Sequence, residues 1–158
     1  MKLYRIARAG TRTDRGAALA AFSGDGAAKY PGRWNFRGIR AVYCSETLAG
    51  ACLETLVHIR PVPRVFPASV FFEVEIRDEL LEEPSLAKLP VGWNVEIVSP
   101  ESRDFGTKFL QSGRAVGLVV PTALIPRERN VIVNPLHPVF KIDDVKGPYP
   151  FYYDRRLA

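Results

Sequence analysis

Three residues in the first part of the sequence have side chains suited to binding and cleaving an anionic ligand: Arg33, Tyr43 and Glu54. An arginine side chain presents a planar fork of donors that suits phosphate oxygens. A tyrosine ring can stack on an aromatic ring of a ligand. A carboxylate stabilises the positive charge that develops on a sugar when a glycosidic bond breaks. The three residue types together are therefore compatible with glycosidic chemistry on a phosphate-bearing ligand.

Each of the three also has a purely structural interpretation. Arg33 lies in the segment Gly-Arg-Trp-Asn at 32–35, after a glycine-rich stretch. Gly32 permits close backbone approach to a ligand, and Trp34 and Asn35 add a stacking surface and an amide. A surface arginine beside a core tryptophan explains the same pattern, and core packing explains Tyr43. Spacing alone favours the structural interpretation for these two residues.

Glu54 is placed by the element that we expect around it. Residues 41–44 read as a short strand, with Tyr43 on the face opposite Val42 and Cys44. Ser45 stands where a helix N-cap is expected, and residues 46–59 are predicted to form a helix. The predicted apolar stripe of this helix consists of Ala49, Cys52, Leu53, Leu56 and Val57. Glu54 flanks that stripe, so it is either a carboxylate with a partner and a function or an exposed residue at the edge of the helix.

The remaining pattern predicts a single α+β domain over residues 1–158, with more strand than helix. Alternation is clearest over residues 69–76, and Ser99-Pro100 begins a helix that ends at Gly113. Further strands are predicted over residues 3–8, 115–120, 131–133, 139–142 and 151–153. A short helix is predicted around residues 17–22, with a loop from there to residue 32 and irregular structure over residues 78–90.

Composition limits the class of protein. Apolar residues make up 47% of the 158 residues, enough for a core. There is no run of about 18 apolar residues and no signal-peptide pattern, so we expect a cytoplasmic protein without a membrane span. The two cysteines, Cys44 and Cys52, lack the spacing and the histidine neighbours of a zinc site. We expect two buried free thiols and no metal.

Charge is unevenly distributed. Residues 1–64 contain eleven Lys and Arg against four Asp and Glu, a net charge of +7 within a chain of net charge +5. Such a segment suits an anionic ligand or an acidic partner. A non-enzymatic module that binds nucleic acid or an acidic partner is therefore an alternative. We do not expect direct nucleic-acid binding, because the arginines form no dense run and no recognised nucleic-acid motif is present.

Eight segments, in order along nearly the whole chain, resemble the RES-domain family. They are L-Y-R-I at 3–6, S-G-D-G-A at 23–27, G-R-W-N at 32–35, V-Y-C-S at 42–45, L-E-T-L-V-H at 53–58, V-P-T at 120–122, N-V-I-V-N-P-L-H-P at 130–138 and F-Y-Y-D-R-R-L at 151–157. The family is named for conserved Arg, Glu and Ser residues. Arg33 and Glu54 match the first two, and Thr122 stands where the family usually has the serine.

The resemblance implies a fold like that of ADP-ribosyltransferases, with a split β-sheet core and flanking helices. It implies the toxin of a two-gene toxin–antitoxin module, paired with an Xre-type antitoxin that blocks the active site, and NAD+ as the substrate. Arg33 would then hold the diphosphate or the nicotinamide ribose, Tyr43 would stack on the nicotinamide, and Glu54 would stabilise the oxocarbenium ion. Further NAD+ contacts are expected from Trp34, Asn35, Thr122 and Asn134.

The resemblance leaves the acceptor of the ADP-ribose open. Some family members degrade NAD+ by hydrolysis or phosphorolysis, which is the reaction that we favour here. The alternative is a mono-ADP-ribosyltransferase that modifies a cellular protein, because one branch of the family is known for that reaction.

Overall fold

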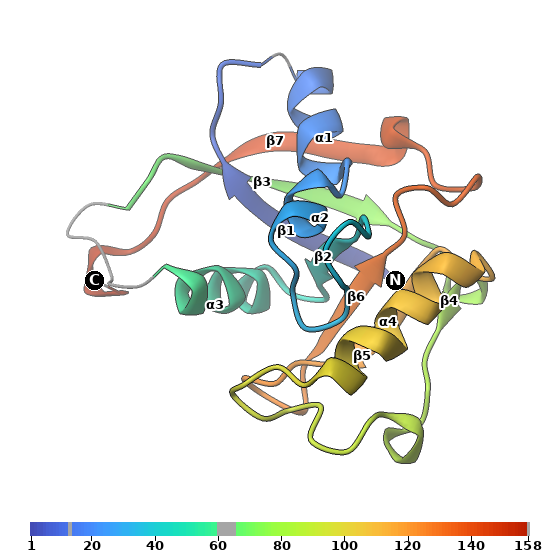
Figure 1. The fold of residues 1–158 in the computed structure, drawn as a ribbon. Coiled ribbons are helices and arrows are strands. Elements are labelled where there is room, and N and C mark those ends of the chain that lie inside the picture. The colour runs from blue at the N-terminus through green and yellow to red at the C-terminus, as the bar shows by residue number, and fades with distance from the viewer. Residues whose placement is uncertain (13, 60–65, 158) are drawn as a thin grey trace.

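A computed structural model describes residues 1–12, 14–59 and 66–157 (Figure 1). Seven strands form one mixed sheet in the order β4-β5-β6-β2-β1-β3-β7. The strands are β1 (Lys2–Arg8), β2 (Val42–Ser45), β3 (Ser69–Glu75), β4 (Leu81–Glu82), β5 (Gly117–Pro121), β6 (Arg129–Val133) and β7 (Val145–Phe151). The helices are α1 (Asp14–Phe22), α2 (Asp25–Lys29), α3 (Leu48–His58) and α4 (Pro100–Ser112). This arrangement confirms the predicted α+β class.

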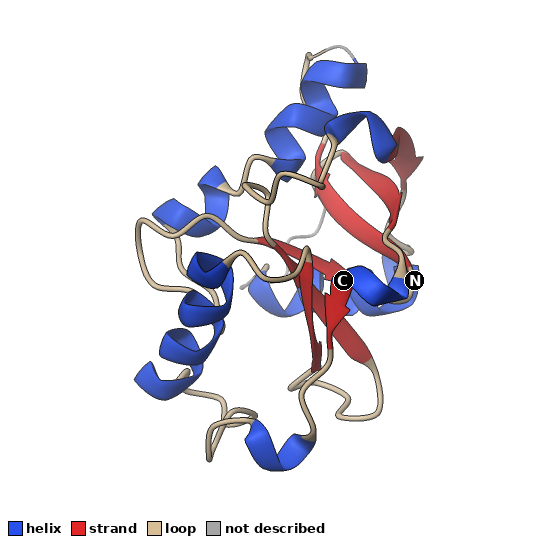
Figure 2. Ribbon diagram, turned by 90° about the vertical axis from the view of Figure 1, so that its right-hand side faces the viewer, coloured by secondary structure: helices blue, strands red, loops and turns tan. Residues whose placement is uncertain are grey.

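The sheet consists of two well-paired parts that meet at a narrow junction. Strands β1 and β3 pair along seven positions, and β2 and β6 pair along four. Strands β1 and β2 pair through a single position, Tyr4 opposite Ser45. In Figure 2 the strands accordingly form an upper and a lower group. The space between the diverging β1 and β2 is where a ligand cavity can form inside a sheet.

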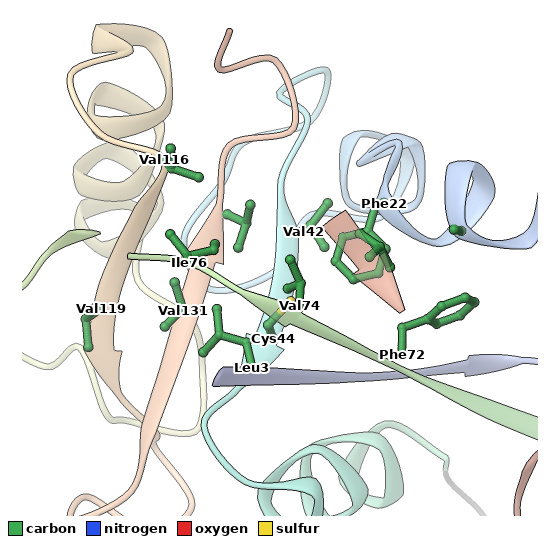
Figure 3. Packing of buried hydrophobic residues seen from close by; sticks show 13 residues of the cluster. Leu3, Phe22, Val42, Cys44, Phe72, Val74, Ile76, Val116, Val119 and Val131 are labelled. Atoms are coloured by element: carbon green, nitrogen blue, oxygen red, sulfur yellow. The ribbon is translucent and has the colours of Figure 1, made fainter. Parts of the chain in front are cut away.

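Alternation along the central strands supplies two apolar clusters, one on each face of the sheet. Val131 and Val133 of β6 belong to one cluster, and Ile132 belongs to the other. Phe22 of α1 packs in the first cluster near Phe72 (Figure 3). The ring centroids of the two residues lie 5.9 Å apart in an edge-to-face arrangement. Phe109 of α4 lies in the second cluster. This burial on both faces explains why β5 and β6 are nearly continuous apolar runs.

Several expected elements are confirmed closely. Helix α4 has Ser99 as its N-cap, whose hydroxyl accepts a hydrogen bond from the Ser102 amide, and Gly113 ends it with a left-handed φ of 59°. Strand β3 buries Phe72 and Val74 while exposing Glu75, as its alternation predicts.

Five expectations about elements are wrong. Residues 78–90 are not irregular throughout, because Leu81–Glu82 form the edge strand β4. Residues 25–29 form α2 rather than loop, with Gly24 in a left-handed conformation (φ 75°) at its N-cap. Residues 139–141 form no strand, and a 3-10 turn follows over Ile142–Asp144. The last strand ends at Phe151 instead of spanning residues 151–153. Its prolines hide it from sequence reasoning, although an edge strand tolerates proline because one of its sides needs no ladder hydrogen bonds.

The fifth correction concerns α3. Ser45 belongs to β2, and the N-cap is Thr47, whose Oγ1 accepts a hydrogen bond from the Gly50 amide at 2.9 Å. The predicted apolar stripe does not face the core, because Ala49 is exposed and Leu53 is 37% exposed. Ala51 is the buried residue of α3. The helix is therefore rotated so that another face meets the sheet.

Candidate functional site

A cavity of about 700 Å³ lies in the gap between β1 and β2. Strand β1 lines it from Tyr4 to Arg8, and α3 lines it with Ala51, Glu54, Thr55 and His58. These α3 positions are three or four residues apart and share one helix face, which contacts β1 (Figure 1). The volume lies within the range of small-molecule sites, roughly 300–1,000 Å³. The rotation of α3 thus brings Glu54 into a space large enough for a nucleotide-sized ligand.

The carboxylate of Glu54 is bound by the side chain of Asn130, which is bound in turn by Ser45 on the neighbouring strand. Asn130 Nδ2 donates to Glu54 Oε1 at 2.7 Å. Ser45 Oγ in turn donates to Asn130 Oδ1 at 2.7 Å, and the two residues are direct cross-strand neighbours. Sequence reasoning missed this use of Ser45 and Asn130, since their contact depends on the register between β2 and β6. The one sequence signal that could have found Asn130 is its position as a polar residue at the start of a buried strand.

Arg33 lies on the segment between α2 and β2. Its Nη1 donates to the carbonyl oxygens of Trp93 at 2.7 Å and Val95 at 2.8 Å. Partial burial lowers the pKa of the Arg33 guanidinium, and the charge of Glu54 acts in the opposite direction. Among the described residues, no hydrogen bond involves Nε or Nη2 of Arg33, so these donors remain for an anion in the cavity.

Tyr43 lines the cavity with its ring, while its hydroxyl has a structural role. The hydroxyl donates to Asn35 Oδ1 at 2.7 Å and accepts from the Trp34 amide at 3.0 Å. Burial raises the pKa of Tyr43 far above its ordinary value, so the phenol stays protonated. A Cβ on Gly32 would lie 2.6 Å from this ring. The glycine therefore permits close approach of Tyr43 rather than of a ligand.

Asn35 and Trp34 are buried residues that hold the segment carrying Arg33 in place. Asn35 is 0% exposed, and its Nδ2 lies within hydrogen-bond distance of the carbonyl oxygens of Ala27, Phe36 and Ile39. Trp34 lines the cavity but is only 3% exposed, and its ring packs against Phe105. The structure gives both side chains a role in holding the Arg33 segment.

The two remaining candidates lie in different places. Thr122 lines the cavity at the end of β5, where its hydroxyl accepts from the amides of Leu124 and Ile125. Asn134 lines a separate hollow and donates to the Leu110 carbonyl at 2.9 Å. It lies four residues after Asn130, beyond the other end of β6, a separation of about 13 Å along a strand. Of the expected contacts, the structure therefore brings neither Asn134 nor the fully buried Asn35 to the lining of the cavity.

Several basic residues of the N-terminal third are engaged within the fold. Arg5 bridges the gap between the strands, donating to the carbonyls of Ala21 and Tyr43 at 2.9 Å each. Arg15 pairs with Asp143, and Arg40 pairs with Asp25. The excess of arginine is thus divided between the cavity and separate ion pairs.

The thiols and possible metal ligands add no second reactive centre. Cys44 is buried, and burial raises its pKa to about 12, so it remains a thiol. Cys52 is only partly buried, which corrects the expectation for that residue. Over residues 1–12, 14–59 and 66–157, no three His, Cys, Asp or Glu side chains are grouped as metal ligands. No helix in those ranges has the length and apolarity needed to span a membrane.

Comparison with known proteins identifies the family. The family model of the RES domain matches residues 2–154. The Prs ADP-ribosylating toxin of Sphingobium sp. (strain YBL2) is 37% identical over 142 residues, which cover 85% of each chain. Toxin Res of Yersinia enterocolitica is 34% identical over 159 residues and 99% of each chain, and Toxin Res of Photorhabdus laumondii is 32% identical over 160 residues. The chain belongs to the RES-domain family.

Proposed function

We propose that this protein is an NAD+-consuming toxin that cleaves the bond between nicotinamide and ribose. One observation carries the proposal. The Glu54 carboxylate, fixed by the Asn130 amide, shares a cavity with the Arg33 guanidinium, part of which has no partner among the described residues. The names of the RES-domain relatives, which are toxins, support the same conclusion.

The chemistry follows from the charges. Breaking the bond between the ribose C1′ and the nicotinamide nitrogen sends the electron pair to the ring, which leaves as neutral nicotinamide. Positive charge then develops on the ribose, and the Glu54 carboxylate lowers the energy of that state. Hydrogen bonding of Glu54 to the ribose 2′-hydroxyl would orient the sugar. Fixed charge inside a cavity acts more strongly than the same charge in water.

Arg33 and Tyr43 bind the two ends of the reacting half of NAD+. The free donors of Arg33 suit the diphosphate. The Tyr43 ring offers a face for the nicotinamide, because its hydroxyl is already bound to Asn35 and fixes the ring in place. Trp34, Asn35 and Thr122 contribute by shaping the segments around this site.

The acceptor that we favour is water or phosphate. Water adds to C1′ and loses a proton, giving ADP-ribose, and phosphate would give the corresponding 1″-phosphate. A second candidate is transfer of ADP-ribose to a protein side chain. The name and the 37% identity of the Sphingobium relative favour this second reaction. Both reactions share the cleavage step and the same role of Glu54.

The biological setting is inferred from the family. We expect a cognate Xre-type antitoxin that blocks this cavity, and a toxin that acts in the cytoplasm, where NAD+ is available. We expect no membrane partner and no direct nucleic-acid binding.

A single variant pair tests the cleavage step. Glu54→Gln keeps the shape of the side chain but removes the charge, so we expect NAD+ consumption to fall by on the order of 100-fold or more. The matched control is Glu75→Gln, an exposed glutamate of β3 outside the cavity, which should keep the wild-type rate. Wild-type turnover by the Glu54→Gln protein would refute the proposal.

The acceptor is read from the fate of the label. Purified protein is incubated with NAD+ labelled in the adenosine half, with and without a cell lysate. Soluble labelled ADP-ribose or its phosphate supports degradation. Label in a discrete protein band that requires the lysate supports transfer to a protein.

A further inference from the structure

We propose that Ser45 and Asn130 are positioning residues, which together fix the Glu54 carboxylate at the point where the sheet divides. The inference rests on the proposed role of Glu54. It adds two residues to which the comparison with relatives assigns no role. It also explains how the carboxylate of a glutamate on a helix can be held in a fixed position.

The direction of the hydrogen-bond chain has one solution. An ionised carboxylate can only accept hydrogen bonds, so the side chain of Asn130 must present its Nδ2 to Glu54. Its Oδ1 then faces Ser45, and an amide oxygen can only accept, so the Ser45 hydroxyl must donate. Loss of the hydroxyl would leave the amide free to turn its oxygen toward Glu54. Ser45 therefore acts on Glu54 through Asn130.

The sheet holds this pair from several sides. Asn130 has strand partners in both directions, with Ser45 of β2 opposite on one side and Val120 of β5 on the other. Ser45, only 5% exposed, is also the residue through which β2 pairs with Tyr4 of β1. The backbone of the pair therefore has little freedom. Only the amide orientation of Asn130 remains to be set, and Ser45 sets it.

The adjacent residues strengthen the same junction. Arg129 donates to both carboxylate oxygens of Glu46, at 2.9 and 2.6 Å, one position along from the Ser45–Asn130 pair. Alternation places this bidentate ion pair on the opposite face of β2 and β6. Side-chain contacts therefore join the two strand ends on both faces of the sheet, next to the contact between Asn130 and Glu54. Catalytic groups held to within about half an ångström need this kind of support from neighbouring residues.

Isosteric substitution separates positioning from shape. Asn130→Asp keeps the shape of the side chain but replaces the donor with a carboxylate that repels Glu54. We expect kcat for NAD+ cleavage to fall by on the order of 100-fold, while KM for NAD+ changes by less than about threefold. Ser45→Ala should lower kcat by on the order of tenfold, again with little change in KM. A merely structural role would lower the stability of the protein without this selective loss of kcat.

The control is a buried serine outside the cavity. Ser102 of α4 is 0% exposed, and its hydroxyl lies 3.1 Å from Ser99 Oγ, away from the cavity lining. Ser102→Ala should keep the wild-type kcat. Circular dichroism and thermal unfolding show which variants are folded. If Asn130→Asp does not fold, the Ser45→Ala and Ser102→Ala pair decides the inference.

A crystal structure of the Asn130→Asp protein tests the positioning of Glu54 without relying on NAD+ cleavage. In the Asn130→Asp protein we expect the Glu54 carboxylate to have turned away from position 130. A Glu54 side chain in its original place would overturn the inference, as would wild-type kcat in both variants or a change confined to KM. If the wild type and Glu54→Gln fail to differ in NAD+ consumption, the proposed function is wrong, and the position of Glu54 in the crystal still decides the inference.

Discussion

The cavity has two walls that hold their charged residues in different ways. On one wall, which we term the sheet wall, Glu54 is fixed through Asn130 and Ser45 by the register of β2 and β6. On the other, the loop wall of residues 30–41, Arg33 is held by backbone carbonyls of another loop. Sheet pairing is rigid, whereas loop contacts can exchange. The carboxylate is therefore fixed before the substrate arrives, while Arg33 binds the loop carbonyls through Nη1 and keeps Nε and Nη2 for a phosphate.

The loop wall depends on its contact with α4. The Phe36 amide donates to Thr107 Oγ1 at 3.0 Å, and Arg103 Nε donates to the Gly32 carbonyl at 3.2 Å. Between them, a Cβ on Gly106 would lie 2.1 Å from the Trp34 carbonyl oxygen. The glycine is thus required for the close approach of helix and loop.

Gly106→Ala is the substitution with the largest expected effect on the difference between the walls. Alanine would gain about 1 kcal/mol in helix propensity. The clash with backbone that cannot move aside costs more, so we expect a net loss of about 2–3 kcal/mol in the free energy of unfolding. Urea unfolding measures this change, and Gly26→Ala of α2, where a Cβ would meet no atom within 4 Å, is the control. An unchanged or increased stability would mean that the loop wall adapts freely.

Hydrogen exchange on the same variant sharpens the result. Amides of residues 32–36 should lose protection, while those of β2 and β6 should keep it, because the sheet wall does not depend on this contact.

Arg33→Lys has the next largest expected effect. Lysine keeps the charge but loses the planar fork, so it cannot bind both the loop carbonyls and a diphosphate. We expect KM for NAD+ to rise by on the order of tenfold with kcat nearly unchanged, the reverse of the pattern for Ser45→Ala. Initial-rate kinetics measure both constants. Arg37→Lys, an exposed arginine on the same loop, is the control. A loss confined to kcat would assign Arg33 to the transition state instead.

The same contrast explains what could be predicted from the sequence. Local signals placed α4 to within a residue, because the N-cap Ser99 and Pro100 stand directly at its start and Gly113 directly at its end. Local signals also placed the β3 alternation. The predicted buried face of α3 was wrong. The apolar stripe is hydrophobic enough for a core face, yet Leu53 on that stripe is partly exposed. Burial of that helix is decided by the gap between β1 and β2, which no local pattern encodes.

The residues of the site also differ in whether the sequence could identify them. The family resemblance marked Arg33, Tyr43, Glu54 and Thr122, and all four line the cavity. It also marked Asn134, which lies just after β6 and lines a separate hollow, and it did not mark Asn130, which lies within β6 and contacts Glu54. Ser45 and Asn130 are 85 residues apart, so only the register of the folded sheet joins them.

Thr122→Ser has the smallest expected effect, because Thr122 belongs to neither wall. Its Oγ1 accepts from the amides of Leu124 and Ile125 at 3.2 and 3.0 Å, which closes the turn after β5. Serine retains this oxygen and loses only a methyl group, so kcat and KM for NAD+ should stay within about twofold and stability within about 1 kcal/mol. Thr122→Val removes the oxygen but keeps the size, and should lower stability by about 1 kcal/mol. If Thr122→Ser changes kcat strongly, the methyl group contacts the substrate, and the position where the family usually has serine helps to select it.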